Sequence, residues 1–399
     1  MSTIAVLGTL DSKGHEHSFV AEEIRQQGHA ALLIDVGCLE PPQVTPDIQR
    51  TALCPELSSL PEDRGVRVAA MAKAAPDFIA KLAAEGKIQG IISLGGGGGT
   101  AIATSAMRAL PIGFPKLMVS TLASGNVAHY VQTKDIAMMP SIVDVAGLNR
   151  VSRTIFSNAA GAICGMVEAN QRNASKPAND RPIIVASMFG NTTTCVNDAK
   201  TQLEAAGYEV LVFHATGSGG KAMEALIESG MVTGVLDITT TEWADEYVGA
   251  TLSAGPTRLD AAARKGIPAI ITPGCLDMAN FGEPHTVPEK FNGRNFYHHN
   301  PQVTLMRTNA EECAALGKII AEKANASTGP VAVLLPLKGI SIISAEGQPF
   351  YDPAADAALF AAIKSHLRAD IPCREIDAKI NDPAFSGACA RELLSMIPH

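Results

Sequence analysis

The feature that most constrains this chain is an alternation of short apolar runs with helical stretches, which recurs along its whole length. In one instance the apolar run Ile88–Leu94 leads through five glycines, Gly95 to Gly99, into a helical stretch over 100–110. Apolar runs separated by helices are typical of parallel strands joined by right-handed crossovers. The alternation therefore predicts an α/β fold, in which helices flank mostly parallel sheets.

The alternation occurs twice, on either side of a polar segment without periodicity, residues 171–181. Such a segment is typical of a domain boundary, so we expect an N-terminal domain over 1–175 and a C-terminal domain over 182–399. Similar segments follow one another in the same order in both halves. For example, Lys116–Asn126 resembles Pro268–Asn280. We therefore expect two Rossmann-like domains with a cleft between them, in which ligands bind beyond the carboxyl ends of the strands.

The predicted elements of the first half are strands over 2–10, 30–35, 88–94 and 116–121, and helices over 15–27, 64–85, 100–110 and 149–170. The predicted strands of the second half cover 183–187, 209–213, 233–238, 267–272, 303–306 and 331–335. Its predicted helices cover 192–206, 221–230, 258–265, 309–325, 353–368 and 383–397.

Composition excludes several classes of protein. The net charge is −8, only 18% of the 399 residues are charged, and 46% are hydrophobic, which argues against disorder. A pI near 5.7 argues against a broad basic surface for nucleic acid. No apolar run approaches the ~20 residues that span a bilayer, so we expect no membrane partner. The low charge leaves apolar surface to cover, which favours a homo-oligomer.

The start of the chain and the cysteines indicate the compartment. The opening MSTIAVLGTLDSKG has neither a basic segment nor a long apolar segment, so it predicts no signal peptide. None of the eight cysteines forms a CxxC pair, which is typical of reduced, mostly buried thiols in a chain of this length. We therefore expect a cytoplasmic protein.

The first loop whose residues could bind a ligand is Gly8–Gly14, which leaves a predicted strand and enters a helix. Backbone N–H groups at such a helix start bind anions. Thr9 offers a hydroxyl, Lys13 a positive charge, and Asp11 a hydrogen-bond acceptor or a metal ligand. The loop lacks the GxxxxGK[ST] spacing of a P-loop. The alternative is a tight turn whose Asp or Ser caps the helix.

The glycine run points more strongly to phosphate. Each of Gly95, Gly96, Gly97, Gly98 and Gly99 costs conformational entropy in a regular element, so packing does not explain the run. Without Cβ atoms, a backbone between a strand and a helix can approach a phosphate closely. A mobile linker is the alternative. The run is not the GxGxxG fingerprint of a dinucleotide site.

A third polar loop in this half runs from Ser120 to Asn126 and includes Thr121, Ser124 and Gly125. Three such loops at one sheet edge indicate a ligand more strongly than any one of them, although ordinary turn chemistry would also explain this one. Asp144 lies beyond it, and Asp11 and Asp144 are the candidate metal ligands.

The second half offers candidate catalytic groups. Cys275 follows a predicted strand, where a helix N-terminus would lower its pKa and make it a nucleophile. His214 or His299 could supply the base if the fold brings one of them near. Asp277 lies in the same loop. Arg258 and Arg307 could each hold a carboxylate or phosphate. A buried inert thiol and a surface salt bridge are the alternatives. No zinc-binding spacing is present.

Several longer motifs carry a resemblance to a known family. The segments AVLGTLDSKGHE, SLGGGGGT, STLASGN, ITPGCLDMANFG and LPLKGISIISAEGQPFYDPAAD resemble an uncharacterised bacterial and fungal protein family. That family is similar to the N-terminal, ATP-binding inhibitory region of the tomato mosaic virus resistance protein. The resemblance covers essentially the whole chain. The barrel-like domain that continues the plant protein is absent here, so we do not expect the antiviral activity.

The resemblance implies two Rossmann-like domains, of which the first binds ATP with magnesium. By motif it implies nucleotide contacts at Gly8, Thr9, Asp11, Lys13, Gly95–Gly99, Thr100, Thr121, Ser124, Gly125 and Asn126. The leading hypothesis is an ATP- and Mg²⁺-dependent phosphoryl or acyl activation of a second small molecule. The alternatives are a non-catalytic nucleotide sensor that binds a partner protein, and a hydrolase or lyase that uses Cys275, His299 or Asp277.

Overall fold

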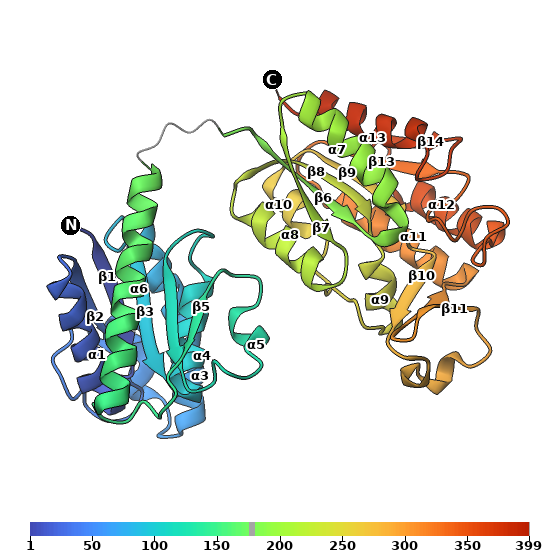
Figure 1. The fold of residues 1–399 in the computed structure, drawn as a ribbon. Coiled ribbons are helices and arrows are strands. Elements are labelled where there is room, and N and C mark those ends of the chain that lie inside the picture. Colours follow the sequence, from blue (N-terminus) through green and yellow to red (C-terminus); the bar gives the residue numbers. More distant parts are fainter. Residues whose placement is uncertain (175–179, 399) are drawn as a thin grey trace. The chain divides into compact units, whose positions relative to one another are not determined.

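The computed structural model describes residues 1–174 and 180–398 and divides into two compact units, Met1–Ala178 and Asn179–His399 (Figure 1). Each unit has its own parallel sheet and its own buried apolar clusters. Of the polar segment expected to separate the domains, the first part continues helix α6 (Arg150–Ala174), and residues 175–179 lie outside the described residues.

Unit 1 is a five-stranded sheet in the order β2-β1-β3-β4-β5, with every pair of neighbours parallel. The strands are β1 (Thr3–Gly8), β2 (Ala30–Asp35), β3 (Gly90–Gly95), β4 (Lys116–Ser120) and β5 (Ala137–Pro140). Helices α1 (Leu10–Gln26) and α6 share one apolar cluster, and α3 (Arg64–Ala84) and α4 (Gly97–Arg108) share another. The sheet is therefore covered on both faces, as its near-continuous apolar strands require.

Unit 2 repeats this plan with six parallel strands in the order β14-β13-β9-β8-β6-β7. The strands are β6 (Ile183–Met188), β7 (Glu209–His214), β8 (Val232–Thr239), β9 (Ala269–Gly274), β13 (Val331–Pro336) and β14 (Cys373–Ile376). The principal helices are α7 (Thr193–Ala205), α8 (Ser218–Glu228), α9 (Glu242–Val248), α10 (Asp260–Lys265), α11 (Ala310–Asn325), α12 (Pro353–His366) and α13 (Pro383–Met396). The prediction of two Rossmann-like α/β domains is confirmed.

Two predicted helices of unit 1 begin earlier than the sequence indicated. Helix α4 starts at Gly97 rather than Thr100, and α1 starts at Leu10 rather than His15. In α1 the backbone at Lys13 is non-helical, with φ −136° and ψ 31°. Glycine has low helix propensity, so the pattern placed both starts after the glycines. The consequence is that three glycines of the run form the first turn of a helix.

A small antiparallel sheet in unit 2 was not foreseen. Its order is β10-β12-β11, formed by β10 (Met278–Phe281), β12 (Val303–Arg307) and β11 (Phe296–Asn300). Residues 303–306 were predicted as one more strand of the repeating plan. Instead they pair with the segment that follows β9, and this pairing places Arg307 beside Met278.

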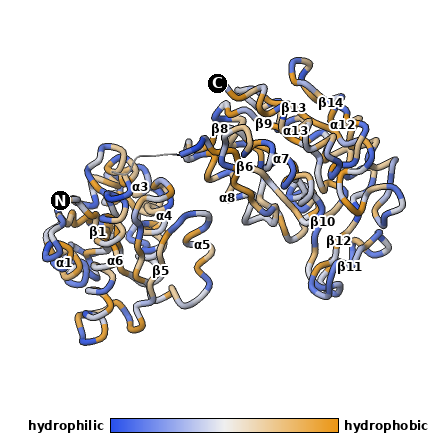
Figure 2. The backbone as a smooth tube through the Cα atoms, turned by 45° about the horizontal axis from the view of Figure 1, so that its top comes forward, coloured by the Kyte–Doolittle hydropathy of each residue, from blue (hydrophilic) through white to orange (hydrophobic). Residues whose placement is uncertain are grey.

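Hydrophobic and hydrophilic segments are interleaved through both units (Figure 2). Within the described part of the chain, no helix has the length and apolarity that crossing a membrane requires.

The close contact between α11 and α12 depends on Gly317. A Cβ at this position would lie 2.5 Å from the carbonyl oxygen of Leu359 and 2.8 Å from the Cβ of Ala362. We expect Gly317→Ala to lower the free energy of unfolding of unit 2 by about 1–3 kcal/mol, because the two helix backbones must separate. Urea unfolding of the full chain measures this.

The matched control is Gly165→Ala in α6, where a Cβ meets nothing within 4 Å. There alanine gains helix propensity, up to about 1 kcal/mol, and the stability should stay equal or rise. Equal stability of the two variants would contradict the close packing of α11 on α12.

Candidate functional site

A pocket of about 280 Å³ opens in unit 1 beyond the carboxyl ends of β1 and β3. Because β2 and β3 lie on opposite sides of β1, the chain leaves β1 and β3 in opposite directions. This divergence is the switch point at which open α/β sheets bind ligands. The turn Thr9–Lys13 forms one side of the pocket, and Gly96–Gly99 forms another.

The glycine run brings backbone N–H groups to this pocket. Gly96 is the N-cap of α4, and Gly97, Gly98 and Gly99 form its first turn, so their N–H groups have no acceptor within the helix. A Cβ on Gly95 would lie 3.2 Å from the Cα of Gly99, so Gly95 is required by the turn itself. A Cβ on Gly97 would meet nothing within 4 Å, so that position opens to free space.

The turn after β1 also shapes the pocket. The N–H groups of Ser12 and Lys13 donate to the Thr9 carbonyl, at 3.1 and 2.9 Å. The Asp11 carboxylate accepts from the backbone N–H groups of Cys38 and Leu39, at 2.9 and 3.0 Å. Asp11 thereby fixes the segment after β2 as a pocket wall. The Lys13 ammonium donates to the carbonyl of Val145 and also lines the pocket.

The buried His17 side chain links the turn after β1 to strand β3. The backbone N–H of Leu94 donates to its Nε2 at 3.2 Å, so Nδ1 carries the proton that it donates to the Lys13 carbonyl at 2.7 Å. Burial lowers the pKa of His17 to about 4. Gly8 makes room for the ring, because a Cβ there would lie 2.4 Å from it. Gly8 thus contributes to the site through His17.

Arg64 is a pocket residue that the sequence patterns missed. It begins helix α3 directly after the N-cap Asp63, and its Nη2 would lie 3.9 Å from a Cβ on Gly98. Leu39, Val68 and Ile102 line the pocket as well and give it an apolar part. Only a cation at a helix start, an unremarkable feature, could have signalled Arg64 in advance.

The remaining predicted nucleotide contacts of unit 1 are divided. Thr121 and Ser124 line a second hollow, of about 490 Å³, beyond β4 and β5, together with the candidate metal ligand Asp144. Thr100 is buried and shares a hydrogen bond of 2.7 Å with Ser120, so it holds α4 to β4 rather than facing the pocket.

The predicted loop ends with two residues that line neither hollow. The Asn126 side chain accepts from the N–H of Ala128 at 3.1 Å, and the Gly125 N–H donates to the Leu122 carbonyl at 3.0 Å. Both contacts are the turn chemistry that was the alternative for this loop.

Magnesium in nucleotide sites is held by one or two carboxylates together with phosphate oxygens and water. Among the described residues, no group of three or more His, Cys, Asp or Glu side chains is placed to hold a metal by itself. Asp11 and Glu40 line the pocket, while Asp144 lies in the second hollow. This donor set fits a magnesium ion that arrives with phosphate rather than one bound by protein alone.

In unit 2, Arg258 is a buried structural residue and does not clamp a ligand. Its Nε donates to Glu242 at 2.7 Å, and its Nη1 donates to Asp237 at 2.9 Å and to Glu224 at 3.1 Å. The guanidinium is 1% exposed and its three carboxylate partners hold its pKa above the usual value. Neither the ligand clamp nor the surface salt bridge expected from sequence is present.

The Glu242 carboxylate fills the glycine-rich turn before α8. It accepts from the N–H groups of Gly217 and Gly220, at 2.7 and 3.0 Å. A Cβ on Gly220 would lie 2.1 Å from the Glu242 carboxylate. This turn therefore already holds an anion that belongs to the chain itself.

The predicted thiol chemistry is not supported by the geometry. Cys275 is fully buried, and burial raises the pKa of its thiol well above the usual value. The residues after it lead into strand β10, so no helix N-terminus follows it. His299 lies on exposed β11, whereas Asp277 is buried and hydrogen-bonded to Ser341 at 2.8 Å. The structure thus does not place Cys275, Asp277 and His299 as a reactive group.

Fold and pockets together define a two-unit α/β protein with Rossmann-like parallel sheets. Models of an uncharacterised protein family, UPF0261, match both units: the N-terminal domain model at residues 2–172 and the C-terminal domain model at 181–397. The chain belongs to the UPF0261 family.

Relatives in this family match along the whole chain. A UPF0261 protein of Clostridium tetani is 49% identical over 99% of this chain and 98% of its own length. One of Rhizobium meliloti is 46% identical over 97% of each chain. The tomato ToMV resistance protein Tm-1(GCR237), from Solanum lycopersicum, is 37% identical over 98% of this chain but only 55% of its own length. The resemblance seen in the sequence motifs is confirmed.

Solved structures show a more distant similarity. UDP-GlcNAc 2-epimerase from Neisseria meningitidis is 8% identical, with a TM-score of 0.25 over 68% of this chain and 82% of that chain. MurG from Acinetobacter baumannii is 10% identical, with a TM-score of 0.24 over 99% of this chain and all of that chain. Similarities this low carry no argument about ligands.

The hydrogen bonds of His17 lead to a spectroscopic prediction. We expect the Nδ1–H tautomer at neutral pH and titration near pH 4, because burial disfavours the charged ring. Nitrogen-15 NMR of the imidazole over a pH series measures both. Titration near the ordinary value of 6.5, or the Nε2–H tautomer, would show that the bond from Leu94 is absent.

The same shift makes unit 1 less stable in acid. Between the ordinary pKa and about 4, the unfolded chain binds a proton that the folded chain does not. The free energy of unfolding therefore falls as the pH drops from 6.5 towards 4, by on the order of 3 kcal/mol from this group.

Proposed function

We propose that unit 1 binds ATP with magnesium, and that the phosphates lie in the pocket between the Thr9–Lys13 turn and the Gly96–Gly99 turn. The observation that carries this proposal is the open pocket at the β1/β3 switch point, where the first N–H groups of α4 have no intrahelical acceptor. Such N–H groups, together with the helix dipole, favour phosphate oxygens.

The charges around the pocket support a phosphate ligand. Arg64 and Lys13 both line it, from the starts of α3 and α1. Backbone N–H groups supply the remaining donors, so the site needs few cationic side chains, in keeping with an acidic chain. A magnesium ion bound with the phosphates would neutralise part of their charge, and Asp11 and Glu40 are the carboxylates of the pocket lining that could help to hold it.

The apolar part of the pocket supports a nucleotide rather than free phosphate. Leu39, Val68 and Ile102 provide a surface on which a planar base can pack. We propose phosphoryl or acyl activation of a second small molecule as the reaction class. In it, Lys13 and Arg64 would orient the phosphates and offset their negative charge.

The variant Gly97→Val tests the pocket directly. A Cβ at Gly97 would meet nothing within 4 Å, so we expect the fold to tolerate valine there. Because Gly97 lines the pocket, we expect the added side chain to occupy space that the phosphates need. We expect ATP binding with magnesium, measured by isothermal titration calorimetry, to be lost while the melting temperature changes little. Gly165→Val in α6 is the matched control, because a Cβ there is equally free and lies outside the pocket. Undiminished binding by Gly97→Val would refute the proposal.

Arg64 supplies a second test. We expect Arg64→Ala to weaken ATP binding about tenfold, or roughly 1.4 kcal/mol, because one charge-assisted contact to phosphate is lost. Lys13→Ala should weaken it as well. Arg25→Ala is the control, since Arg25 is an exposed residue of α1 that pairs with Glu22. If the affinities of the Arg64 and Arg25 variants are the same, Arg64 does not contact the ligand.

A further inference from the structure

The connection between β13 and α12, residues 337–352, is long for a compact domain and contains no helix or strand. Loops beyond ~12–15 residues without secondary structure are usually functional or disordered. This loop is held in place, because Ile340, Ser341, Ser344 and Phe350 are all buried. A long loop that is fixed in one conformation is a typical carrier of a binding site.

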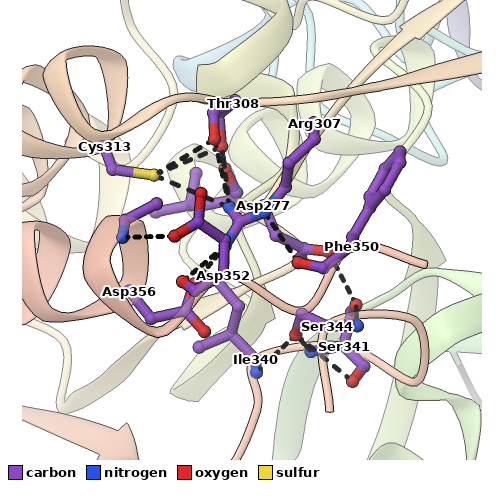
Figure 3. A network of polar contacts seen from close by, with 12 residues as sticks. Asp277, Arg307, Thr308, Cys313, Ile340, Ser341, Ser344, Phe350, Asp352 and Asp356 are labelled. Carbon is purple, nitrogen blue, oxygen red and sulfur yellow. Dashed lines mark hydrogen bonds and ion pairs between the residues drawn. The ribbon is translucent and has the colours of Figure 1, made fainter. Parts of the chain in front are cut away.

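Arg307 holds the C-terminal part of this loop. Its Nε donates to the Phe350 carbonyl at 2.8 Å, and its Nη2 donates to the Asp352 carbonyl at 3.3 Å. The same Nη2 contacts the Asp356 carboxylate at 2.6 Å, in the first turn of α12 (Figure 3). One buried guanidinium therefore fixes the end of the loop and the start of the helix together.

Ser341 and Ser344 hold the N-terminal part. The Ser344 hydroxyl accepts from the N–H groups of Ile340 and Ser341, each at 3.0 Å, and the Ser341 hydroxyl donates to the Asp277 carboxylate at 2.8 Å (Figure 3). At Gly339 the backbone has φ +137°, and a Cβ would lie 3.0 Å from the Cα of Ala345. The loop thus closes tightly on itself.

The network of polar contacts that holds this loop is costly to bury. Arg307, Asp277 and Asp356 are each less than a tenth exposed, and the Oδ1 atom of Asp277 has no hydrogen-bond partner among the described residues. Replacing a buried ion pair by apolar residues is often neutral or stabilising, so such pairs are weak evidence for stability. The network instead holds both ends of the loop over residues 337–352 in place.

The fixed loop forms the wall of a pocket of about 290 Å³ beyond the carboxyl ends of β13 and β14. Its lining includes Lys338 and Lys379, which follow these two strands. It also includes two carboxylates, those of Glu346 and of Asp356, and the Asp356 carboxylate is paired with Arg307. Lys338 pairs with Asp377 at 2.8 Å at the surface. Among the described residues, Lys379 has no carboxylate within ion-pair distance.

We propose that this pocket is a ligand site of unit 2, which binds a small organic anion, a carboxylate or a phosphate monoester. Lys379 and Lys338 attract the anionic group. The start of α12 does not contribute, because the Asp352 carboxylate already caps it by accepting from the N–H of Ala355 at 3.0 Å. Tyr351 and Phe360, which also line the pocket, provide apolar surface for the carbon skeleton. The glycine-rich turn before α8 is excluded as an anion site, because Glu242 fills it. The proposal concerns unit 2 alone and does not depend on ATP binding by unit 1.

Lysine labelling of the full chain tests this site. The probes are succinate, as a carboxylate, and inorganic phosphate, as the headgroup of a phosphate monoester; choline is the cationic control. We expect at least one anion to slow acetylation of Lys379 several-fold, measured by peptide mass spectrometry, and choline to have no effect. Lys364 is the internal control, because it lies on the exposed side of α12, pairs with Glu375 at 2.6 Å and does not line the pocket.

Variants separate this pocket from every other anion site. The effective anion should raise the melting temperature of the wild type and of Lys364→Ala, and this increase should be lost in Lys379→Ala. Protection of Lys379 should persist in Gly97→Val, whose unit 1 pocket is blocked, so failure of ATP binding does not imitate failure here. No protection by either anion, or an unchanged increase in Lys379→Ala, overturns the proposal. Protection by succinate alone or by phosphate alone supports it and identifies the anionic group.

Discussion

The structure depends on one constraint: the first N–H groups of a helix have no acceptor within that helix and must find one elsewhere. In unit 2 the turn before α8 meets this need internally, because Glu242 accepts from Gly217 and Gly220. In unit 1 the corresponding N–H groups at Gly97, Gly98 and Gly99 border an open pocket. The same constraint thus yields a closed structural contact in one unit and a candidate ligand site in the other.

The two glycine-rich turns differ in how much free space a side chain would find at them. At Gly220 a Cβ would meet the carboxylate of Glu242 at 2.1 Å, whereas at Gly97 it would meet nothing within 4 Å. The glycine of unit 2 is therefore needed for a contact inside the protein, and packing does not require that of unit 1. Because packing leaves Gly97 free and the position lies in the first turn of a helix at a switch point, we propose that a ligand takes the place of the side chain there.

Sequence patterns predicted the two α/β units and the glycine run at a strand end because both features are local. They could not predict that Glu242 fills the turn at Gly217–Gly220, since the partners lie more than twenty residues apart and are joined only by the fold. For the same reason Arg258 was interpreted as a ligand clamp, although three carboxylates surround it. Arg64 and His17 were missed because a single cation or imidazole on a helix has no distinctive spacing.

The buried charges of unit 2 have two different consequences. The Arg258 cluster leaves almost no free space around it. The void that Glu224 and Asp237 line has a volume of about 10 Å³. The Arg307 network instead surrounds a loop and leaves a pocket of about 290 Å³ beside it. Burial of an arginine is costly in both places. The pocket beside the Arg307 network lies beyond the carboxyl ends of β13 and β14, and this is why we propose a ligand site there rather than beside Arg258.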